Sequence, residues 1–482
     1  MIEKKKILSN LFWKFLERIL AQSASFVVSI ILARLLYPSD YGIIALSMIF
    51  VSVADVFVVS GFSVALIQKD KIDNLDYSTV FWFSIVISII MYIILFILSP
   101  YIAIFFDNNN LKNVLRVIGL HFIIKAVNSV QHAYVSKNLL FKRYFFSTLF
   151  GTLFSGVIGI ILAYNGYGVW ALVCQFLINS LIDTIILFFT VDWRPQFLFS
   201  IQSLSKTFKF GKNIFFDGIL GEIQVNFKNA FIGKAFSITD LAYFTKGKSI
   251  PNLFVNNLVD SVSSTLLPTM SYDKNDNNII VLMKKASQLC SYLVFPILLG
   301  LFLVSREFIL IFLTEKWMGM LMFLKISSIS LMFNILMTSR NEALKAIGRS
   351  DIFFYEHTLF RVIDTIFLII FIRQNAIIIL VLDTISRLVL LILVMMNAHV
   401  YNHYHIVNQI LDIKNTLLGC LFLAIMVSAV NIFKIPILWM FVIKIFVGVL
   451  SYCSISILLK FEEFENIVLM IKMFFVKVQS RF

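Results

Sequence analysis

Long apolar runs separated by short polar stretches make up most of this chain. A helix of about 20 apolar residues crosses the ~30 Å hydrocarbon core of a membrane, and about fourteen such runs follow one another. Their approximate centres are Val27, Val51, Ile89, Ile124, Gly156, Phe176, Val225, Val255, Phe295, Ser330, Phe367, Val389, Ala424 and Gly448. The pattern predicts an all-α integral membrane protein with about fourteen transmembrane helices.

One stretch of the pattern occurs twice, 200 residues apart. Residues 31–42 align without a gap with residues 231–242, so that a cation, an acid and a small residue repeat in register. Such a repeat indicates two copies of one structural unit. Because each copy holds six spans, an even number, both copies enter the membrane in the same direction, and the repeats are parallel.

The polar stretch from Asp192 to Lys212 separates the two copies. We therefore expect two parallel six-helix lobes around a central cavity, followed by two extra C-terminal helices. The predicted boundaries are 1–200 for the N-lobe with spans one to six, 201–400 for the C-lobe with spans seven to twelve, and 401–482 for spans thirteen and fourteen with a cytoplasmic tail.

Composition and charge agree with this class. The chain is 60% hydrophobic and has a mean hydropathy of +0.91, far from the values of soluble domains. The net charge of +14 is concentrated in loops on one side of the predicted membrane and in the C-terminal tail. This distribution follows the positive-inside rule, which places both termini in the cytoplasm. The basic excess reflects topology, and no nucleic-acid partner is expected.

Charged residues inside the predicted spans are the main functional signal. Ten lipid-facing charges would cost roughly 25–35 kcal/mol at about 2.5–3.5 kcal/mol each, so most must face protein or water. Several lie on polar stripes at helical spacing, such as His121, Lys125, Asn128 and His132. Such stripes predict a hydrated cavity.

The charges divide into three groups. The first group holds cations whose stripe has too few acids to balance them, and these are predicted to bind an anionic cargo: Lys14, Arg18, Lys125 and Lys228. Lys246 and Lys248 belong to the same group, but for these two a structural role is equally plausible. Acids that could couple transport to an ion or line the cavity are Glu17, Asp55, Asp183, Asp217 and Glu222. A structural role is expected for Arg34 and Lys234, which can extend outward, and for the pair of Asp383 with Arg387.

Other chemistry is not indicated. The four cysteines have no CxxC spacing, and the histidines near residue 400 are predicted to lie in a solvated turn, so no metal site is expected. Neither a catalytic cluster nor a phosphate-binding glycine loop is visible. The sequence predicts neither an enzyme nor a cofactor.

Several motifs resemble one family. The run LARLLYPSDYG over residues 32–42, Ala54 to Phe57, Ala65 to Gln68, Phe81-Trp82 and Leu139 to Lys142 are similar to signatures of Wzx-type polysaccharide flippases. These form the polysaccharide transporter branch of the multidrug/oligosaccharidyl-lipid/polysaccharide exporter superfamily, and the likeness is greatest to its colanic-acid and teichuronic-acid exporters.

The resemblance implies two lobes arranged as a V and a lipid-linked cargo. An undecaprenyl-pyrophosphate-linked oligosaccharide would be flipped across the bacterial cytoplasmic (inner) membrane by alternating access. This oligosaccharide would be the repeat unit of a lipopolysaccharide, capsule or exopolysaccharide. Expected partners are this cargo, membrane lipids and polysaccharide polymerase or export machinery. Moving a pyrophosphate through hydrocarbon costs tens of kcal/mol, so a cationic, hydrated path is required.

Two alternatives share the fold. One is a cation-coupled multidrug exporter, which an acid such as Asp55 or Asp183 could serve. A surplus of cations in the cavity would disfavour the binding of the cationic drugs that such proteins export. The other alternative is a flippase for the peptidoglycan lipid precursor, whose cargo carries the same lipid pyrophosphate.

Overall fold

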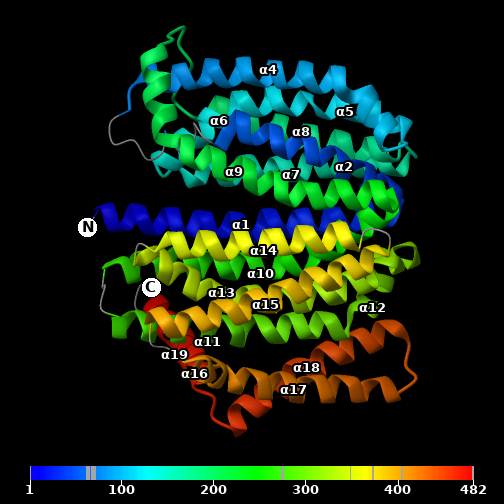
Figure 1. Cartoon of the computed structure of the whole chain (residues 1–482), viewed down its shortest axis with the longest axis vertical. Coiled ribbons are helices and arrows are strands. Elements are labelled where there is room, and N and C mark those ends of the chain that lie inside the picture. The colour runs from blue at the N-terminus through cyan, green and yellow to red at the C-terminus, as the bar shows by residue number, and fades with distance from the viewer. Residues whose placement is uncertain are drawn as a thin grey trace. The chain divides into compact units, whose positions relative to one another are not determined.

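The computed structural model describes residues 2–60, 66, 72–272, 276–347, 349–371, 374–402 and 405–479 (Figure 1). Within these ranges nearly every residue is helical and no strand occurs, which confirms the all-α class. The elements are α1 (Ile2–Leu35), α2 (Pro38–Asp55), η1 (Val56–Ser60), α4 (Asn74–Phe105), α5 (Asn109–Ile118), α6 (Leu120–Lys137), α7 (Phe141–Tyr164), α8 (Val169–Thr190), α9 (Ile201–Ala235), α10 (Ile238–Tyr272), α11 (Asp276–Leu303), α12 (Ser305–Phe308), η2 (Ile309–Leu313), η3 (Glu315–Met320), α13 (Leu321–Ala346), α14 (Ser350–Ile370), α15 (Ala376–Asn402), α16 (Ile406–Asp412), α17 (Lys414–Ala429), η4 (Val430–Ile432), α18 (Ile437–Leu458) and α19 (Glu462–Gln479).

The helices have the length and apolarity of membrane spans. In the described part of the chain, 10 segments are long and apolar enough to cross a membrane, so this is a multi-pass membrane protein. They include α4, α7, α8 and α18. The other four expected spans have their centres on α1, α9, α10 and α14. The count of fourteen stays a prediction.

The chain divides into two compact units, Met1–Ala242 and Tyr243–Phe482. In the first unit, α9 packs against α2 and α4. The division into segments 1–200, 201–400 and 401–482 stays a prediction.

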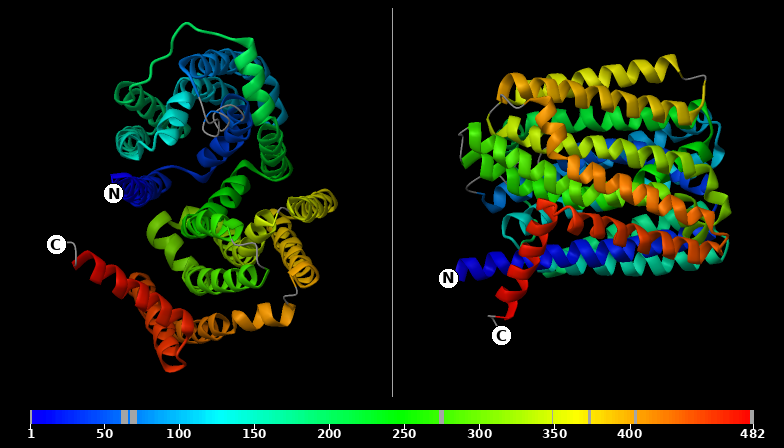
Figure 2. Two further views of the ribbon diagram at one scale, coloured as in Figure 1. Left: turned by 90° about the vertical axis from the view of Figure 1, so that its left-hand side faces the viewer. Right: turned by 90° about the horizontal axis from the view of Figure 1, so that it is seen from below.

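In the first unit, α7 packs against both α1 and α8 (Figure 2). Side chains cap several helices, because the first N–H groups of a helix have no partner within it. At the start of α4, the Asp73 carboxylate accepts a hydrogen bond from the Asp76 N–H at 2.8 Å. At the start of α9, the Ser200 hydroxyl oxygen accepts one from the Ser203 N–H at 3.3 Å.

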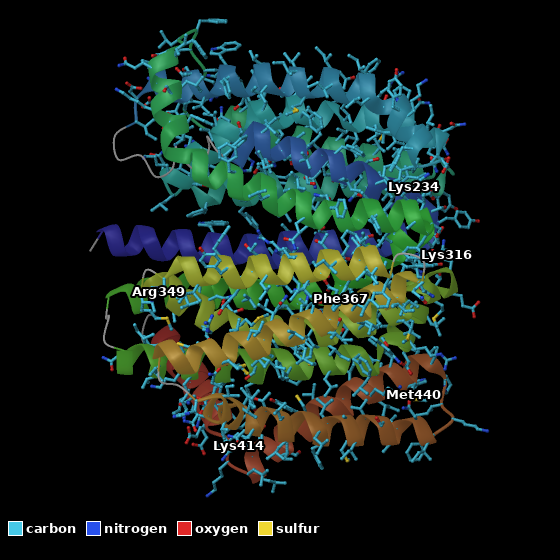
Figure 3. The ribbon with its side chains drawn as sticks, in the orientation of Figure 1. Lys234, Lys316, Arg349, Phe367, Lys414 and Met440 are labelled. Atoms are coloured by element: carbon cyan, nitrogen blue, oxygen red, sulfur yellow. The ribbon has the colours of Figure 1, made fainter. Side chains whose placement is uncertain are left out.

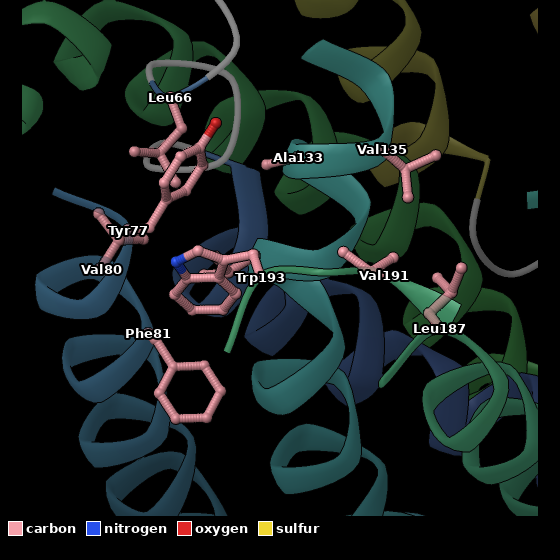
Figure 4. Packing of buried hydrophobic residues seen from close by; sticks show 10 residues of the cluster. Leu66, Tyr77, Val80, Phe81, Ala133, Val135, Leu187, Val191 and Trp193 are labelled. Atoms are coloured by element: carbon pink, nitrogen blue, oxygen red, sulfur yellow. The ribbon is translucent and has the colours of Figure 1, made fainter. Parts of the chain in front are cut away.

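The segment between α8 and α9 lies against the start of α4. Trp193 is buried beside Tyr77 and Phe81, with ring centroids 5.6 Å and 6.0 Å away (Figure 4). Further along, the Trp82 indole N–H donates to the Gln196 carbonyl oxygen at 2.8 Å. These contacts fix the connection to α9 on the first unit.

In the second unit, α13 packs against α11 and α15, and α14 packs against α15. The α17–α18 hairpin joins this group through Tyr452, whose hydroxyl donates to the Tyr292 carbonyl oxygen of α11 at 3.0 Å. The helix α19 runs across the direction of α17 and α18 (Figure 2).

Exposed apolar side chains cover the outward faces of both units. Ile93 and Ile97 of α4 are half exposed, as are Phe446 and Val449 of α18. Such surfaces are typical of helices that contact lipid.

Candidate functional site

The repeated stretch forms the same corner twice. The helix α1 ends at Leu35 and α2 begins at Pro38, while α9 ends at Ala235 and α10 begins at Ile238. The helix boundaries therefore repeat at an offset of 200 residues, as the gapless alignment predicts.

The repeated acids of the two corners cap the helices that follow. The Asp40 carboxylate accepts a hydrogen bond from the Tyr37 N–H at 3.1 Å. In the second corner, the Asp240 carboxylate accepts from the Ser237 hydroxyl at 2.7 Å, and that hydroxyl oxygen accepts from the Asp240 N–H at 2.9 Å. Both acids have a structural role, which explains their repetition.

The repeated cations lie at the surface. Arg34 is exposed. Lys234 lies at the end of α9 (Figure 3). Its ammonium is 2.8 Å from the Asp107 carboxylate and lies over the Phe105 ring. Both side chains are exposed at the ends of their helices, which confirms the prediction that they extend outward.

A partly buried polar group of the first unit centres on Asp183 of α8. Its Oδ2 atom accepts a hydrogen bond from Asn128 Nδ2 at 2.6 Å and lies 2.8 Å from His132 Nε2. Asn128 and His132 belong to the polar stripe of α6, so this stripe faces α8. Among the described residues, the buried Asn128 Oδ1 has no hydrogen-bond partner.

A second polar group lies further toward the start of α6. His121 is buried, with Nδ1 3.0 Å from the Ser180 hydroxyl of α8 and Nε2 3.6 Å from the carboxylate of Asp55. In the described chain, the other carboxylate oxygen of Asp55 is buried and has no hydrogen-bond partner. Lys125 is half-buried on α6, between His121 and Asn128 in sequence.

A third polar group joins α9 to α2. The Asn226 side-chain amide donates to the Ser52 hydroxyl at 2.7 Å and to the Glu222 carboxylate at 2.9 Å. Lys228, two residues further along α9, is half-buried. The described contacts thus place the predicted acids Asp55, Asp183 and Glu222 in three separate polar groups.

In the second unit, a polar pocket lies between α10, α13 and α15. Lys248 lines it, with its ammonium 4.8 Å from the centroid of the Phe244 ring. Arg387 lines the same pocket and donates from Nε to Asp383 at 3.1 Å, which confirms the predicted pair, and from an Nη to Asn334 at 3.0 Å. Lys246 is half-buried on α10 and does not line this pocket.

Two buried ion pairs of the second unit have no signal in the sequence. Arg340 of α13 and Glu356 of α14 form two hydrogen bonds of 2.9 Å and 3.0 Å. Lys444 of α18 lies 2.6 Å from Glu307 of α12. The partners are 16 and 137 residues apart, so helical periodicity could not pair them.

Four predicted side chains lie outside the described part of the structure. These are Lys14, Glu17 and Arg18 on α1 and Asp217 on α9. Their roles stay predictions.

Comparison with known families identifies the class of this membrane protein. Residues 31–322, more than half of the chain, match the family described as "Polysaccharide biosynthesis protein". The chain belongs to this family.

Individual relatives are similar over part of their length. The teichuronic acid biosynthesis protein TuaB of Bacillus subtilis is 28% identical over 308 residues, covering 61% of this chain and 62% of TuaB. The lipopolysaccharide biosynthesis protein WzxC of Escherichia coli is 22% identical over 322 residues, covering 65% of this chain and 64% of WzxC. The succinoglycan biosynthesis transport protein ExoT of Rhizobium meliloti is 22% identical over 322 residues, covering 66% of this chain and 64% of ExoT. The chain thus matches less than two thirds of the length of each.

Solved structures share the fold. The lipid II flippase MurJ, in an inward closed conformation, superposes with a TM-score of 0.77 at 17% identity, covering 94% of this chain and 99% of MurJ. An inward-facing multidrug resistance MATE family transporter of the MOP superfamily gives 0.60 at 15% identity, covering 79% of this chain and 94% of the transporter. At these identities the likeness concerns the fold alone.

Proposed function

We propose that this protein is a lipid-linked oligosaccharide flippase. Its cargo is an undecaprenyl-pyrophosphate-linked polysaccharide repeat unit, moved across the bacterial cytoplasmic membrane by alternating access, without enzymatic chemistry. Family membership, together with relatives named for teichuronic acid and lipopolysaccharide biosynthesis, supports a polysaccharide cargo.

The observation that carries the proposal is that each unit holds cations on helices of transmembrane length. Lys125 is half-buried on α6 between two polar groups, and Lys248 lines a polar pocket on α10. A cation at the centre of a membrane helix costs about 2.5–3.5 kcal/mol, so its position calls for a function. A pyrophosphate is an anion that such cations can bind. We assign the same role to Lys14, Arg18, Lys228 and Lys246.

Cations on the helices of each unit favour an anionic cargo over the cationic drugs of a multidrug exporter. In the second unit, the pocket lined by Lys248 and Arg387 holds one carboxylate, that of Asp383, which pairs with Arg387. A flippase for the peptidoglycan lipid precursor remains the second candidate, because the chain shares its fold with MurJ and the two cargoes share a lipid pyrophosphate.

The acids of the first unit suit ion coupling. Asp55 keeps a buried carboxylate oxygen that has no partner in the described chain, and Asp183 contacts His132. A carboxylate oxygen of this kind can accept a proton or a sodium ion. Together with Glu222, and with Glu17 and Asp217, these acids would couple an ion gradient to transport or line the hydrated path.

The topology belongs to the same proposal. Both termini lie in the cytoplasm, and the lobes 1–200 and 201–400 alternate the access to the cargo, with residues 401–482 as an accessory pair of helices and a tail. Membrane lipids, the polymerase and the export machinery are the partners.

Deletion of the gene tests the proposal. Cells without the protein should accumulate undecaprenyl-pyrophosphate-linked repeat units on the cytoplasmic side and lose the surface glycan, and a plasmid copy should restore both. Accumulated peptidoglycan precursor would instead identify the second candidate. Greater drug sensitivity with unchanged lipid-linked glycan would identify a drug exporter.

A further inference from the structure

The pocket of the second unit is small and is lined mainly by polar side chains. It lies wholly between α10, α13 and α15 and has a volume of about 170 Å³. At ~30 Å³ for each water, it has room for about five or six water molecules. Its polar lining groups include Lys248, Asn252, Ser327, Ser330, Asn334 and Arg387.

The guanidinium of Arg387 is held in place but keeps donor capacity. Asp383 accepts from Nε and Asn334 accepts from one Nη, and the guanidinium carbon lies 5.2 Å from the centroid of the Phe360 ring. In the described part of the chain, these bonds use two of the five guanidinium N–H groups. The Arg387 side chain is 23% exposed, so the remaining donors can reach a ligand.

The charge of the pocket is positive. Lys248 and Arg387 contribute two positive charges, and Asp383 contributes one negative charge. Asp383 is buried and bound to Arg387, so it orients the guanidinium as well as partly neutralising it. The ligand that best balances this arrangement carries a negative group.

Neutral groups of the pocket suit a hydroxylated ligand. Ser327 is 3% exposed, and within the described residues its hydroxyl has no hydrogen-bond partner. Buried hydroxyls normally have a partner, because leaving one unsatisfied costs free energy. Ser330, Asn252 and Asn334 add donors and acceptors of the kind that bind sugar hydroxyls.

We propose that this pocket binds a sugar that carries an oxyanion, either a carboxylate or a phosphate. The guanidinium of Arg387 matches the geometry of both oxyanions, Lys248 adds charge, and the hydroxyls and amides bind the sugar ring. This inference rests on the proposed function, since it makes the pocket a recognition site for an acidic sugar of the glycan cargo.

Calorimetry on the purified full-length protein in nanodiscs tests the proposal with four probes: glucuronate, glucose 6-phosphate, glucose and inorganic phosphate. At least one charged sugar should bind about tenfold tighter than both glucose and inorganic phosphate, because a charge-assisted hydrogen bond adds to the contacts of the ring. The preferred charged sugar identifies the oxyanion. Binding of neither charged sugar, or equal binding of glucose or of phosphate alone, would overturn the proposal.

Variants locate the binding in the pocket. Arg387→Gln should weaken the preferred charged sugar about tenfold or more. The matched control is Lys285→Gln on an exposed position of α11, for which affinity should stay unchanged. Because Arg387→Gln leaves Asp383 buried without this partner, Ser327→Leu provides a second test: it fills the cavity without changing charge and should abolish binding.

Normal affinity in a folded Ser327→Leu protein would contradict the pocket assignment. The binding assay does not depend on export. A gene deletion without accumulated lipid-linked glycan would therefore contradict the proposed function and leave the measured sugar affinity unaffected.

Discussion

A Cβ atom on Gly42 would lie 2.0 Å from the carbonyl oxygen of Ile238, so the start of α2 packs directly against the second copy of the repeated corner. Nearby, a Cβ on Gly233 would lie 2.7 Å from the end of the Leu46 side chain, so α9 also approaches α2 closely. The two corners that the sequence repeats therefore touch within the first unit, and glycine is required where backbone meets backbone.

Gly42→Ala should destabilise the protein. The obstructing atom belongs to the backbone and cannot rotate away, so the corner must shift, at a cost of about 1–3 kcal/mol. Thermal unfolding of the purified protein measures the effect. Gly300→Ala in α11 is the control, since an added Cβ there meets nothing within 4 Å. Equal melting temperatures for the two variants would refute the close approach.

Replacing only Arg340 of the buried Arg340–Glu356 pair should destabilise the protein more than replacing both residues. Arg340→Ala leaves the Glu356 carboxylate buried without its bidentate partner, and we expect a loss of about 3–5 kcal/mol. The double variant Arg340→Met/Glu356→Leu should recover most of that loss. Breaking the exposed pair with Arg143→Ala, which faces Asp192, should cost about 1 kcal/mol or less. A double variant no more stable than Arg340→Ala would contradict this account.

The polar group around Asp183 should stabilise the contact of α6 with α8. Asp183→Ala removes the acceptor of Asn128 and the partner of His132, and we expect a loss of about 1.5–3 kcal/mol for this charge-assisted bonding. His132→Ala should lose less, since Asn128 still bonds to Asp183. The reverse order of melting temperatures would show that Asp183 does not organise this group.

Substitutions of Lys125 and of Lys234 should differ in their effect on glycan export. Lys125→Ala should reduce the surface glycan about tenfold or more, since it removes a cation from the proposed pyrophosphate path, and Lys125→Arg should retain activity. Lys234→Ala removes an exposed cation from a structural corner and should leave export near wild type. Immunoblots of membranes confirm equal amounts of protein. A larger loss with Lys234→Ala would mean that the corner itself takes part in transport.

Local patterns of the sequence predicted much of the fold. All the expected span centres fall on helices, because a run of apolar residues in a membrane must satisfy its backbone within the helix. The corners at residues 35–38 and 235–238 were predictable because a gapless repeat preserves both the helix ends and the capping acids, Asp40 and Asp240.

For most contacts of the candidate site, the sequence predicted only one of the two partners. Spacing along α6 placed His121 and Asn128 on one face, but the partners Ser180 and Asp183 come from another helix more than fifty residues away. In the second unit, the spacing of Asp383 and Arg387 predicted their pair. Lys248 lines the same pocket because of how α10 packs in the second unit. Helical spacing within one sequence does not predict such packing between helices.

Flipping in reconstituted vesicles tests the central claim most directly. Proteoliposomes that hold an undecaprenyl-pyrophosphate-linked oligosaccharide can be treated with an external glycosidase, which digests only the glycan of the outer leaflet. With the wild-type protein under an imposed ion gradient, we predict that digestion proceeds beyond the outer-leaflet fraction, and that Lys125→Ala stops it there. Digestion that halts at the same fraction with wild-type protein, with Lys125→Ala and with empty vesicles would contradict the account.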